Sequence, residues 1–388
     1  MPDRRAHIHR RRRNLLAGAV AAFALGLAAG AMSGDDDAGS PAPRAPGSAA
    51  TPAGGDPAEP PTAPVDELSL REQVGQLIVL RFAGTAPPAY VRDVLRERRA
   101  AGVILFRDNV VDAAQLPALT HRLRAAGGRP IVAVDQEGGE IRIVPWAPPA
   151  ASAPEQQAAG SVRADAEAAG AALRGLGITV SLAPVGDVPS VAGAALARRA
   201  FASEPDAVSA AMTAAVEGWR AGGVAATAKH FPGLGGATVN TDDGPATVDR
   251  SRAELEQTDL PPFAAAIEAG VPLVMVGHAR YPALDPDRIA SQSELIVRGL
   301  LRERMGFDGV VVTDSMEAQA SLATGDIGTV SERAVRAGSD LLLLTGRGSY
   351  APVYEHLLAL AARAPAFRAR VREAAARVLA LKRDTPAP

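Results

Sequence analysis

Residues 272–314 read "PLVMVGHARYPALDPDRIASQSELIVRGLLRERMGFDGVVVTD", and this stretch decides the fold class. Its two ends, "PLVMVGH" (272–278) and "GVVVTD" (309–314), are short apolar runs without polar alternation, as is typical of parallel strands covered on both faces. Between them, "SELIVRGLLRERMG" carries apolar residues at helical spacing and ends on a glycine. The stretch therefore predicts one strand–helix–strand unit.

The same alternation continues from about residue 66 to the end of the chain. Six further strands are predicted: "QLIVLRF" (76–82), "AGVILF" (101–106), "PIVAVD" (130–135), "TVSLAPV" (179–185), "GVAATAKH" (223–230) and "DLLLLTG" (340–346). Eight such units predict an α/β fold, a closed (β/α)8 TIM-type barrel that forms a single domain over residues 66–388. A doubly wound open sheet is the alternative.

The N-terminal part of the chain predicts export. Four arginines at 10–13 precede the uncharged run "NLLAGAVAAFALGLAAGAM" (14–32), so residues 1–32 resemble a signal peptide or an uncleaved membrane anchor. Residues 33–65 are rich in Pro, Ala and Gly and predict a disordered linker. We expect a protein that is secreted or is anchored through residues 14–32 at the extracellular face of the cytoplasmic membrane.

Composition excludes several classes of function. The 388 residues are 47% hydrophobic and 22% charged, with a net charge of −2, which gives no reason to expect nucleic acid as a partner. The chain has no cysteine, which excludes disulfides, thiol nucleophiles and cysteine-based metal sites. Neither a metal nor a cofactor is expected.

Ionisable side chains follow five of the predicted strands: Asp135, Asp187, Lys229 with His230, His278 and Asp314. A single aspartate at a strand end is usually a helix cap. The carboxyl ends of barrel strands, however, meet at one mouth, where active sites are built. Five such positions together predict a site at this end of the barrel.

Lys229 is one of only two lysines in a chain that otherwise uses arginine, the other being Lys382. This choice indicates a need for a compact ammonium group, although chance is the alternative. His230 and His278 lack the spacing of a metal site. We expect them to bind a polar ligand, and a core histidine bonded to the backbone is the alternative.

The motifs "AGVILFRDN", "VDQEGG", "KHFPGLG" and "LRERMGFDGVVVTDSM" resemble glycoside hydrolase family 3, specifically its exported single-barrel β-N-acetylglucosaminidases. The resemblance implies a retaining β-glycosidase that removes terminal β-linked sugars, N-acetylglucosamine above all, from cell-wall-derived or other glycans. It also implies that Asp314 is the nucleophile, which forms a covalent glycosyl-enzyme. Sugar-binding roles carry over to Asp135, Lys229, His230 and Arg199, the last within "ARRAFASEP".

Two positions depart from the family pattern. Where the family reads "GGRVQR", this chain reads "GGEIRIV", so that the second arginine falls on Ile143. Arg142, one place earlier, is a candidate substitute, but a shift of one residue changes the direction of a side chain.

The second departure concerns the loop after "KHFPG", where the exported enzymes carry an Asp-x-His pair whose histidine is the acid/base. Here the pair falls on Asn240 and Asp242. Three explanations stay open: Asp242 or Asp243 is the acid/base with a raised pKa, the acid/base comes from elsewhere, or turnover is lost. A glycan-binding pseudoenzyme and a β-glucosidase-like enzyme for another sugar are therefore the alternative functions.

Overall fold

The computed structural model describes residues 64–387. The predicted signal or anchor at 1–32 and all but the last two residues of the predicted linker at 33–65 lie outside them. Within the described range, no helix is both long and apolar enough to span a bilayer.

Eight parallel strands form a closed barrel in the order β1-β12-β11-β8-β7-β6-β3-β2. They are β1 (Ile78–Arg81), β2 (Gly102–Ile104), β3 (Ile131–Val134), β6 (Val180–Ser181), β7 (Ala225–Phe231), β8 (Leu273–Val276), β11 (Val310–Ser315) and β12 (Leu341–Leu344). β1 pairs with both β2 and β12, so the sheet has no free edge. The barrel prediction is confirmed, each strand lies within or overlaps its predicted run, and the open sheet is excluded.

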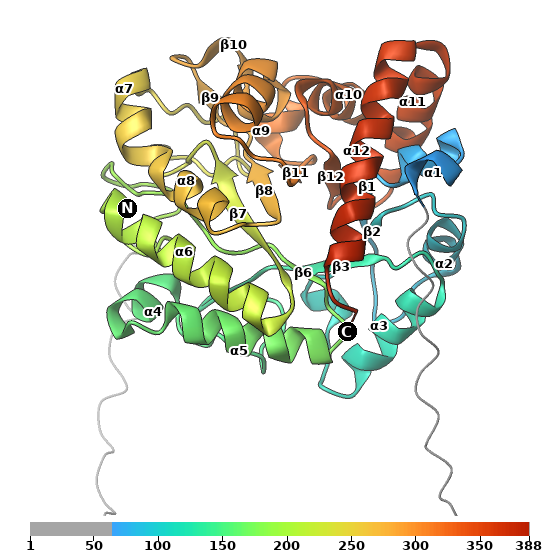
Figure 1. The fold of residues 1–388 in the computed structure, drawn as a ribbon, viewed down its shortest axis with the longest axis horizontal. Coiled ribbons are helices and arrows are strands. Elements are labelled where there is room, and N and C mark those ends of the chain that lie inside the picture. The colour runs from blue at the N-terminus through green and yellow to red at the C-terminus, as the bar shows by residue number, and fades with distance from the viewer. Residues whose placement is uncertain (1–63, 388) are drawn as a thin grey trace, which may run out of the picture. The chain divides into compact units, whose positions relative to one another are not determined.

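Helices surround the barrel (Figure 1). They are α1 (Leu70–Gly75), α2 (Ala89–Arg96), α3 (Gln115–Ala125), α4 (Ala153–Ala159), α5 (Val162–Gly175), α6 (Pro205–Gly222), α7 (Arg252–Glu254), α8 (Pro261–Glu268), α9 (Gln319–Leu322), α10 (Ile327–Ala337), α11 (Tyr350–Arg363) and α12 (Pro365–Asp384). Shorter or wider helical segments are η1 (Val65–Glu67), η2 (Arg107–Asn109), η3 (Leu255–Asp259), η4 (Ala290–Gln292) and η5 (Leu295–Arg304).

Two small hairpins extend the connections that leave the carboxyl ends of barrel strands. β4 (Gln136–Gly138) pairs with β5 (Ile141–Arg142) directly after β3, and β9 (Arg280–Tyr281) pairs with β10 (Asp285–Ile289) after β8. Both hairpins therefore stand at the end of the barrel where TIM-type enzymes place their sites.

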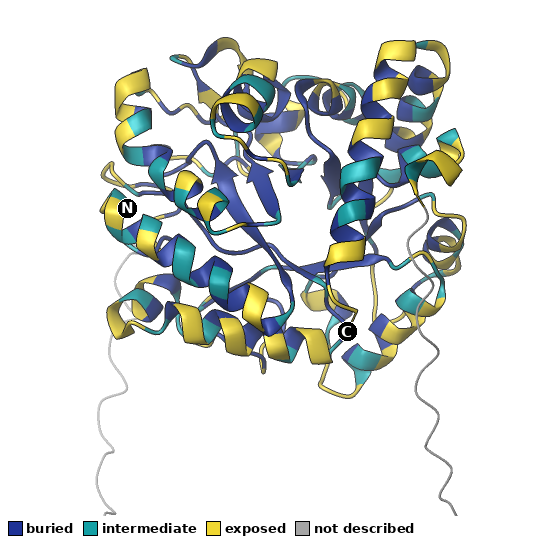
Figure 2. Cartoon of the chain, in the orientation of Figure 1, coloured by how far each residue is buried: buried dark blue, intermediate teal, exposed yellow. Residues whose placement is uncertain are grey.

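The core has two parts, one between the strands and the helices and one inside the barrel. In Figure 2 the barrel strands are almost entirely buried, whereas most helices bury one face and expose the other. Inside the barrel, Val378 and Leu381 of α12 pack with strand residues such as Ala225 and Leu341. Because these four residues lie near the amino ends of the strands or on the last helix, α12 closes that end of the barrel.

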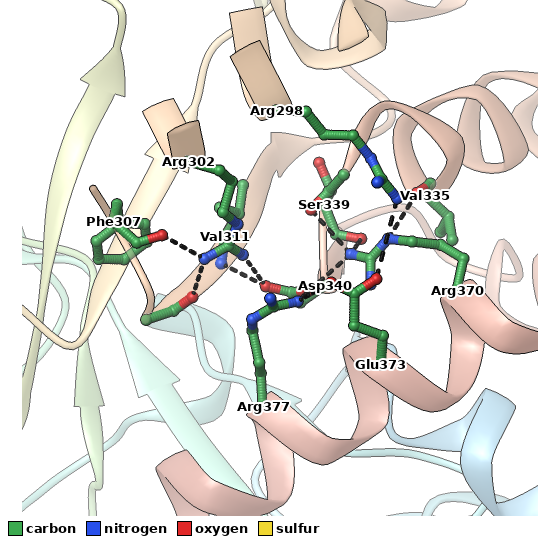
Figure 3. A network of polar contacts seen from close by, with 12 residues as sticks. Arg298, Arg302, Phe307, Val311, Val335, Ser339, Asp340, Arg370, Glu373 and Arg377 are labelled. Atoms are coloured by element: carbon green, nitrogen blue, oxygen red, sulfur yellow. Dashed lines mark hydrogen bonds and ion pairs between the residues drawn. The ribbon is translucent and has the colours of Figure 1, made fainter. Parts of the chain in front are cut away.

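A buried acid fastens α12 to the amino end of β12 (Figure 3). Asp340 is fully buried, and Arg302 and Arg370 form ion pairs with it, the latter at 2.6 Å. Its Oδ2 also accepts a hydrogen bond from the N–H of Val311 at 3.0 Å. Arg370 donates as well to three backbone carbonyls of the α10–β12 region. These partners satisfy the buried charge, which without them would destabilise the fold.

Candidate active site

A cavity of about 310 Å³ opens at the carboxyl ends of the barrel strands. Its wall consists of Arg81, Ile104, Phe106, Asp135, Ile141, Leu182, Leu196, Arg199, Lys229, His230, Leu234, Asn240, Asp242, Met275, Asp314, Ser315, Leu343 and Thr345. Six of the eight predicted site residues are in this wall. The barrel therefore brings together predicted site residues that are up to 179 positions apart in the sequence, from Asp135 to Asp314.

Lys229 and Arg199 form a buried charge network with two carboxylates. The Nζ of Lys229 lies 2.7 Å from both Asp135 Oδ1 and Glu137 Oε1. Arg199 donates two hydrogen bonds to Glu137, Nε to Oε2 at 2.9 Å and Nη2 to Oε1 at 2.6 Å. Asp135 and Arg199 keep 21% and 24% of their side chains exposed, so both face the cavity from a rigid base.

This network fixes the charges of its members. Burial alone would raise the pKa of Glu137, but the charges of Lys229 and Arg199 outweigh it and lower the pKa to about 2. Burial alone would lower the pKa of Lys229, but Asp135 and Glu137 raise it. An ammonium group has three N–H donors, and the described residues take up two of them. The cation is therefore held in place with one donor for a ligand.

His230 is oriented by the buried Asp187. Its Nδ1 lies 2.7 Å from Asp187 Oδ2, and Asp187 Oδ1 accepts backbone hydrogen bonds from His230 and Leu234 at 3.3 and 2.6 Å. Such a carboxylate fixes the direction of the imidazole ring. His230 therefore presents its other ring nitrogen, Nε2, for contacts beyond Asp187.

Asp314 lies near the end of β11 and is partly exposed to the cavity. Its Oδ1 accepts a hydrogen bond from the N–H of Ser315 at 2.8 Å. Burial alone would raise the pKa of Asp314, but the charges of His230 and His278 and the hydrogen bond from Ser315 outweigh it and lower the pKa. The carboxylate is therefore held ionised, as a nucleophile requires.

Asp242 stands at the exposed rim of the same cavity. The loop that carries it is tied to the start of α9, because the N–H groups of Gln319 and Ala320 donate to the carbonyls of Asp242 and Thr241 at 3.4 and 3.1 Å. Partial burial of the carboxyl group raises the pKa of Asp242, and the charge of Asp314 raises it further. Screening by water limits the shift, because the residue is exposed.

Comparisons with known proteins agree with this geometry. Residues 69–381 match the family model described as the glycosyl hydrolase family 3 N terminal domain. This match covers most of the chain. The chain belongs to glycoside hydrolase family 3.

Relatives and solved structures narrow the type of hydrolase. A β-hexosaminidase of Xanthomonas oryzae is 35% identical over 280 residues, which are 69% of this chain and 83% of that protein. A β-N-acetylhexosaminidase structure from Beutenbergia cavernae aligns with a TM-score of 0.76 and 35% identity over 81% of this chain and 99% of that one. A family 3 β-N-acetylglucosaminidase structure from a Paenibacillus species aligns with a TM-score of 0.78 and 32% identity over 83% of this chain, but over only 64% of that longer chain. The protein is thus a glycoside hydrolase of the β-N-acetylhexosaminidase-like kind.

Two predicted site residues of this family 3 chain do not line the cavity. His278 is fully buried, its Nδ1 2.8 Å from Ser291 Oγ and its Nε2 2.8 Å from the carbonyl of Ser315. Its contact with the Ser315 carbonyl supports the Asp314–Ser315 segment. A sugar could bind a ring nitrogen of His278 only by displacing Ser291 or Ser315. Arg142 lies on β5, where side chains alternate, and Ile141 faces the cavity in its place.

Three residues of the site were missed by the sequence argument. Glu137 lies on the β4–β5 hairpin rather than at a barrel strand end. Its signal is indirect: Lys229 and Arg199 place two cations at the site, and both form ion pairs with Glu137. Arg81 ends β1, and Phe106 follows β2, with the guanidinium 4.5 Å from the ring centre. The strand-end rule that selected Asp314 also applies to these two positions.

Among residues 64–387, no group of three or more His, Asp or Glu side chains is arranged to hold a metal ion. The cavity wall carries three carboxylates, a fixed ammonium group, two guanidinium groups and an oriented imidazole. Side chains of these types can form hydrogen bonds with sugar hydroxyls and transfer protons.

Proposed function

We propose that this protein is an exported, retaining β-glycosidase that removes terminal β-linked N-acetylglucosamine from cell-wall-derived or other glycans. Asp314 attacks the anomeric carbon and forms a covalent glycosyl-enzyme. Asp242 protonates the leaving oxygen and then, as a base, activates the water that releases the sugar. Asp135, Arg199, Lys229 and His230 hold the sugar hydroxyls.

One observation carries the proposal. Asp314 and Asp242 line one cavity, and their surroundings shift their pKa values in opposite directions. A pair of carboxyl groups separated in this way is the usual division between nucleophile and acid in a glycosidase. The names of the relatives support the amide sugar, and residues 1–32 support export.

The test is hydrolysis of a panel of nitrophenyl β-glycosides by the purified protein. We expect turnover of the N-acetylglucosaminide and its loss in Asp314→Ala. Trapping with a fluorinated sugar should label the peptide that contains Asp314. Turnover by Asp314→Ala at the same rate as the unmodified protein would refute the assignment of Asp314 as the nucleophile.

Asp242 is tested by the leaving group and by pH. Asp242→Ala should slow a substrate with a poor leaving group much more than a nitrophenyl sugar, because only the former needs protonation. Since the pKa of Asp242 is raised, the acid form persists to higher pH, and activity on the poor leaving group should fall as pH rises through that pKa. An unchanged rate on that substrate would exclude Asp242 as the acid.

A second candidate is a glycan-binding protein without turnover. Asn240 and Asp242 favour it, because they stand where the family resemblance expects the Asp-x-His pair. Binding of an oligosaccharide without hydrolysis of any sugar in the panel would support this candidate. Preferred hydrolysis of the glucoside would instead support the β-glucosidase-like enzyme.

A further inference from the structure

A second cavity, of about 500 Å³, has four arginines among the nine residues of its wall. We call it the arginine pocket. It consists of Arg280, Asp287, Arg288, Ile289, Gln292, Ala323, Thr324, Arg333 and Arg336. Four cations and one carboxylate therefore share its wall, in a chain whose overall net charge is −2.

Most of these arginines have no acidic partner in the described part of the chain. Arg336 pairs with Glu332 at 2.8 Å, whereas Arg280, Arg288 and Arg333 form no ion pair within residues 64–387. Arg333 donates to the carbonyl of Thr324 at 2.7 Å, and Arg280 to that of Asp287 at 3.3 Å. These two guanidinium groups are therefore held in position while their charges stay uncompensated, which suits an oxyanion.

The position of the pocket links it to the reaction. α9 has four residues, so its axis is about 6 Å long. Its first turn binds the carbonyls of Thr241 and Asp242, and Ala323 and Thr324 directly after its other end line the arginine pocket. Arg280 also pairs through its backbone with the far end of the Asp242 loop, at Ala246 and Val248. The Asp242 loop is thus joined to the arginine pocket through α9 and through Arg280.

We propose that the arginine pocket binds a carboxylate on the leaving-group side of an acidic glycan. This inference rests on the proposed function for its direction along the substrate, but the pocket itself is independent of turnover. Asp287 in the same wall opposes a doubly charged group more strongly than a singly charged one. The preferred occupant is therefore a sugar acid rather than a phosphate.

Binding tests the proposal directly. The probe is a tetrasaccharide of alternating N-acetylglucosamine and glucuronic acid with N-acetylglucosamine at its non-reducing end. The neutral comparison is N-acetylchitotetraose, and calorimetry on the full-length Asp314→Asn protein measures both without relying on hydrolysis. We expect the acidic tetrasaccharide to bind more tightly, with an affinity that falls as salt rises.

Arg288→Glu is the sharpest variant, because the Arg288 side chain forms no hydrogen bond or ion pair within the described range, and its loss removes no polar contact. It should weaken the acidic probe about tenfold and leave the neutral probe unchanged. The matched control is Arg122→Glu, which makes the same charge change at an exposed position of α3. It should change neither affinity.

Equal affinity for the two probes, or equal weakening by the two variants, would show that the arginines are only a solvated surface. Failure of the proposed function has a different signature. If no glycoside is hydrolysed and the acidic probe still requires Arg288, the pocket stands and the hydrolase assignment falls. If glycosides are hydrolysed and Arg288→Glu binds the acidic probe normally, the pocket falls alone.

Discussion

The only two lysines of this chain lie at opposite ends of the barrel, and both are buried, with 2% and 6% of their surface exposed. Lys229 lies between two carboxylates, which raise its pKa. Lys382, on α12, binds the neutral amide of Gln76 at 2.7 Å. Burial, together with the smaller effect of the charges of Arg98 and Arg129, lowers the pKa of Lys382 to about 7.

The difference teaches that burial alone does not decide the charge of a lysine. Carboxylate partners keep Lys229 cationic at the site, whereas Lys382 has only a neutral acceptor and like charges nearby. At the amino end of the barrel, where Lys382 lies, Asp340 forms buried ion pairs with Arg302 and Arg370 instead. One end of the barrel therefore keeps a cation with a donor for a ligand, and the other end uses its cations to hold the fold.

The largest effect should come from removing the buried cation Lys229. Lys229→Met leaves Asp135 and Glu137 with less opposite charge, which should destabilise the protein by about 3–5 kcal/mol. We expect kcat/KM on the nitrophenyl N-acetylglucosaminide to fall about 100-fold. Denaturant unfolding and steady-state kinetics measure the two effects. Lys229→Arg keeps the charge and should lose less stability, so equal losses in both variants would contradict the electrostatic explanation.

Because Glu137 is paired with Lys229, the free energy of unfolding should decrease at low pH. The pKa of Glu137 is about 2 in the folded protein, below its ordinary value of 4.5. The stabilisation is therefore complete above pH 4.5 and is lost as pH falls toward 2, by about 3 kcal/mol in total. Unfolding of Glu137→Gln measured across this range should lack that part of the pH dependence. A variant whose stability falls as steeply as that of the unmodified protein would assign the effect to other acids.

Lys382 should give a pH dependence of the same sign in a more alkaline range. Its folded pKa of about 7 lies below its ordinary value of 10.5, so the unfolded chain binds the extra proton between these values. Stability should rise with pH in this window, by up to about 1.4 kcal/mol per pH unit. Lys382→Met should remove this rise, as thermal unfolding at several pH values can show. Lys382→Arg stays charged throughout, and it should be less stable than the unmodified protein.

The smallest effect is expected at the edge of the Asp340 network. Arg377 is 27% exposed and lies 3.4 Å from Asp340, so Arg377→Gln should cost less than about 1 kcal/mol. Arg370→Gln removes a buried partner and should cost several times more by the same unfolding measurement. Similar losses of stability in the two variants would mean that burial does not determine how much each arginine contributes.

Much of the fold could be predicted because the eight buried strands are continuous apolar runs, such as Leu341–Leu344. The same pattern places Asp135, Lys229 and Asp314 at one mouth. It could not place Glu137 or choose between Ile141 and Arg142, because those depend on a short hairpin whose register only the folded chain defines. The scarcity of lysine was no guide by itself, since Lys382 is equally rare and lies at the other end.

Closure of the barrel also has a consequence for synthesis. β1 pairs with β12, and α12 then fills the amino end of the barrel with Val378 and Leu381. The first strand therefore waits for its partner until nearly the whole chain has been translated. A nascent or truncated chain that stops after β11 leaves the edges of β1 and β11 open to pairing with other chains. We expect cotranslational folding to stay incomplete until the last helix is made, and late nonsense mutations to cause aggregation rather than partial activity.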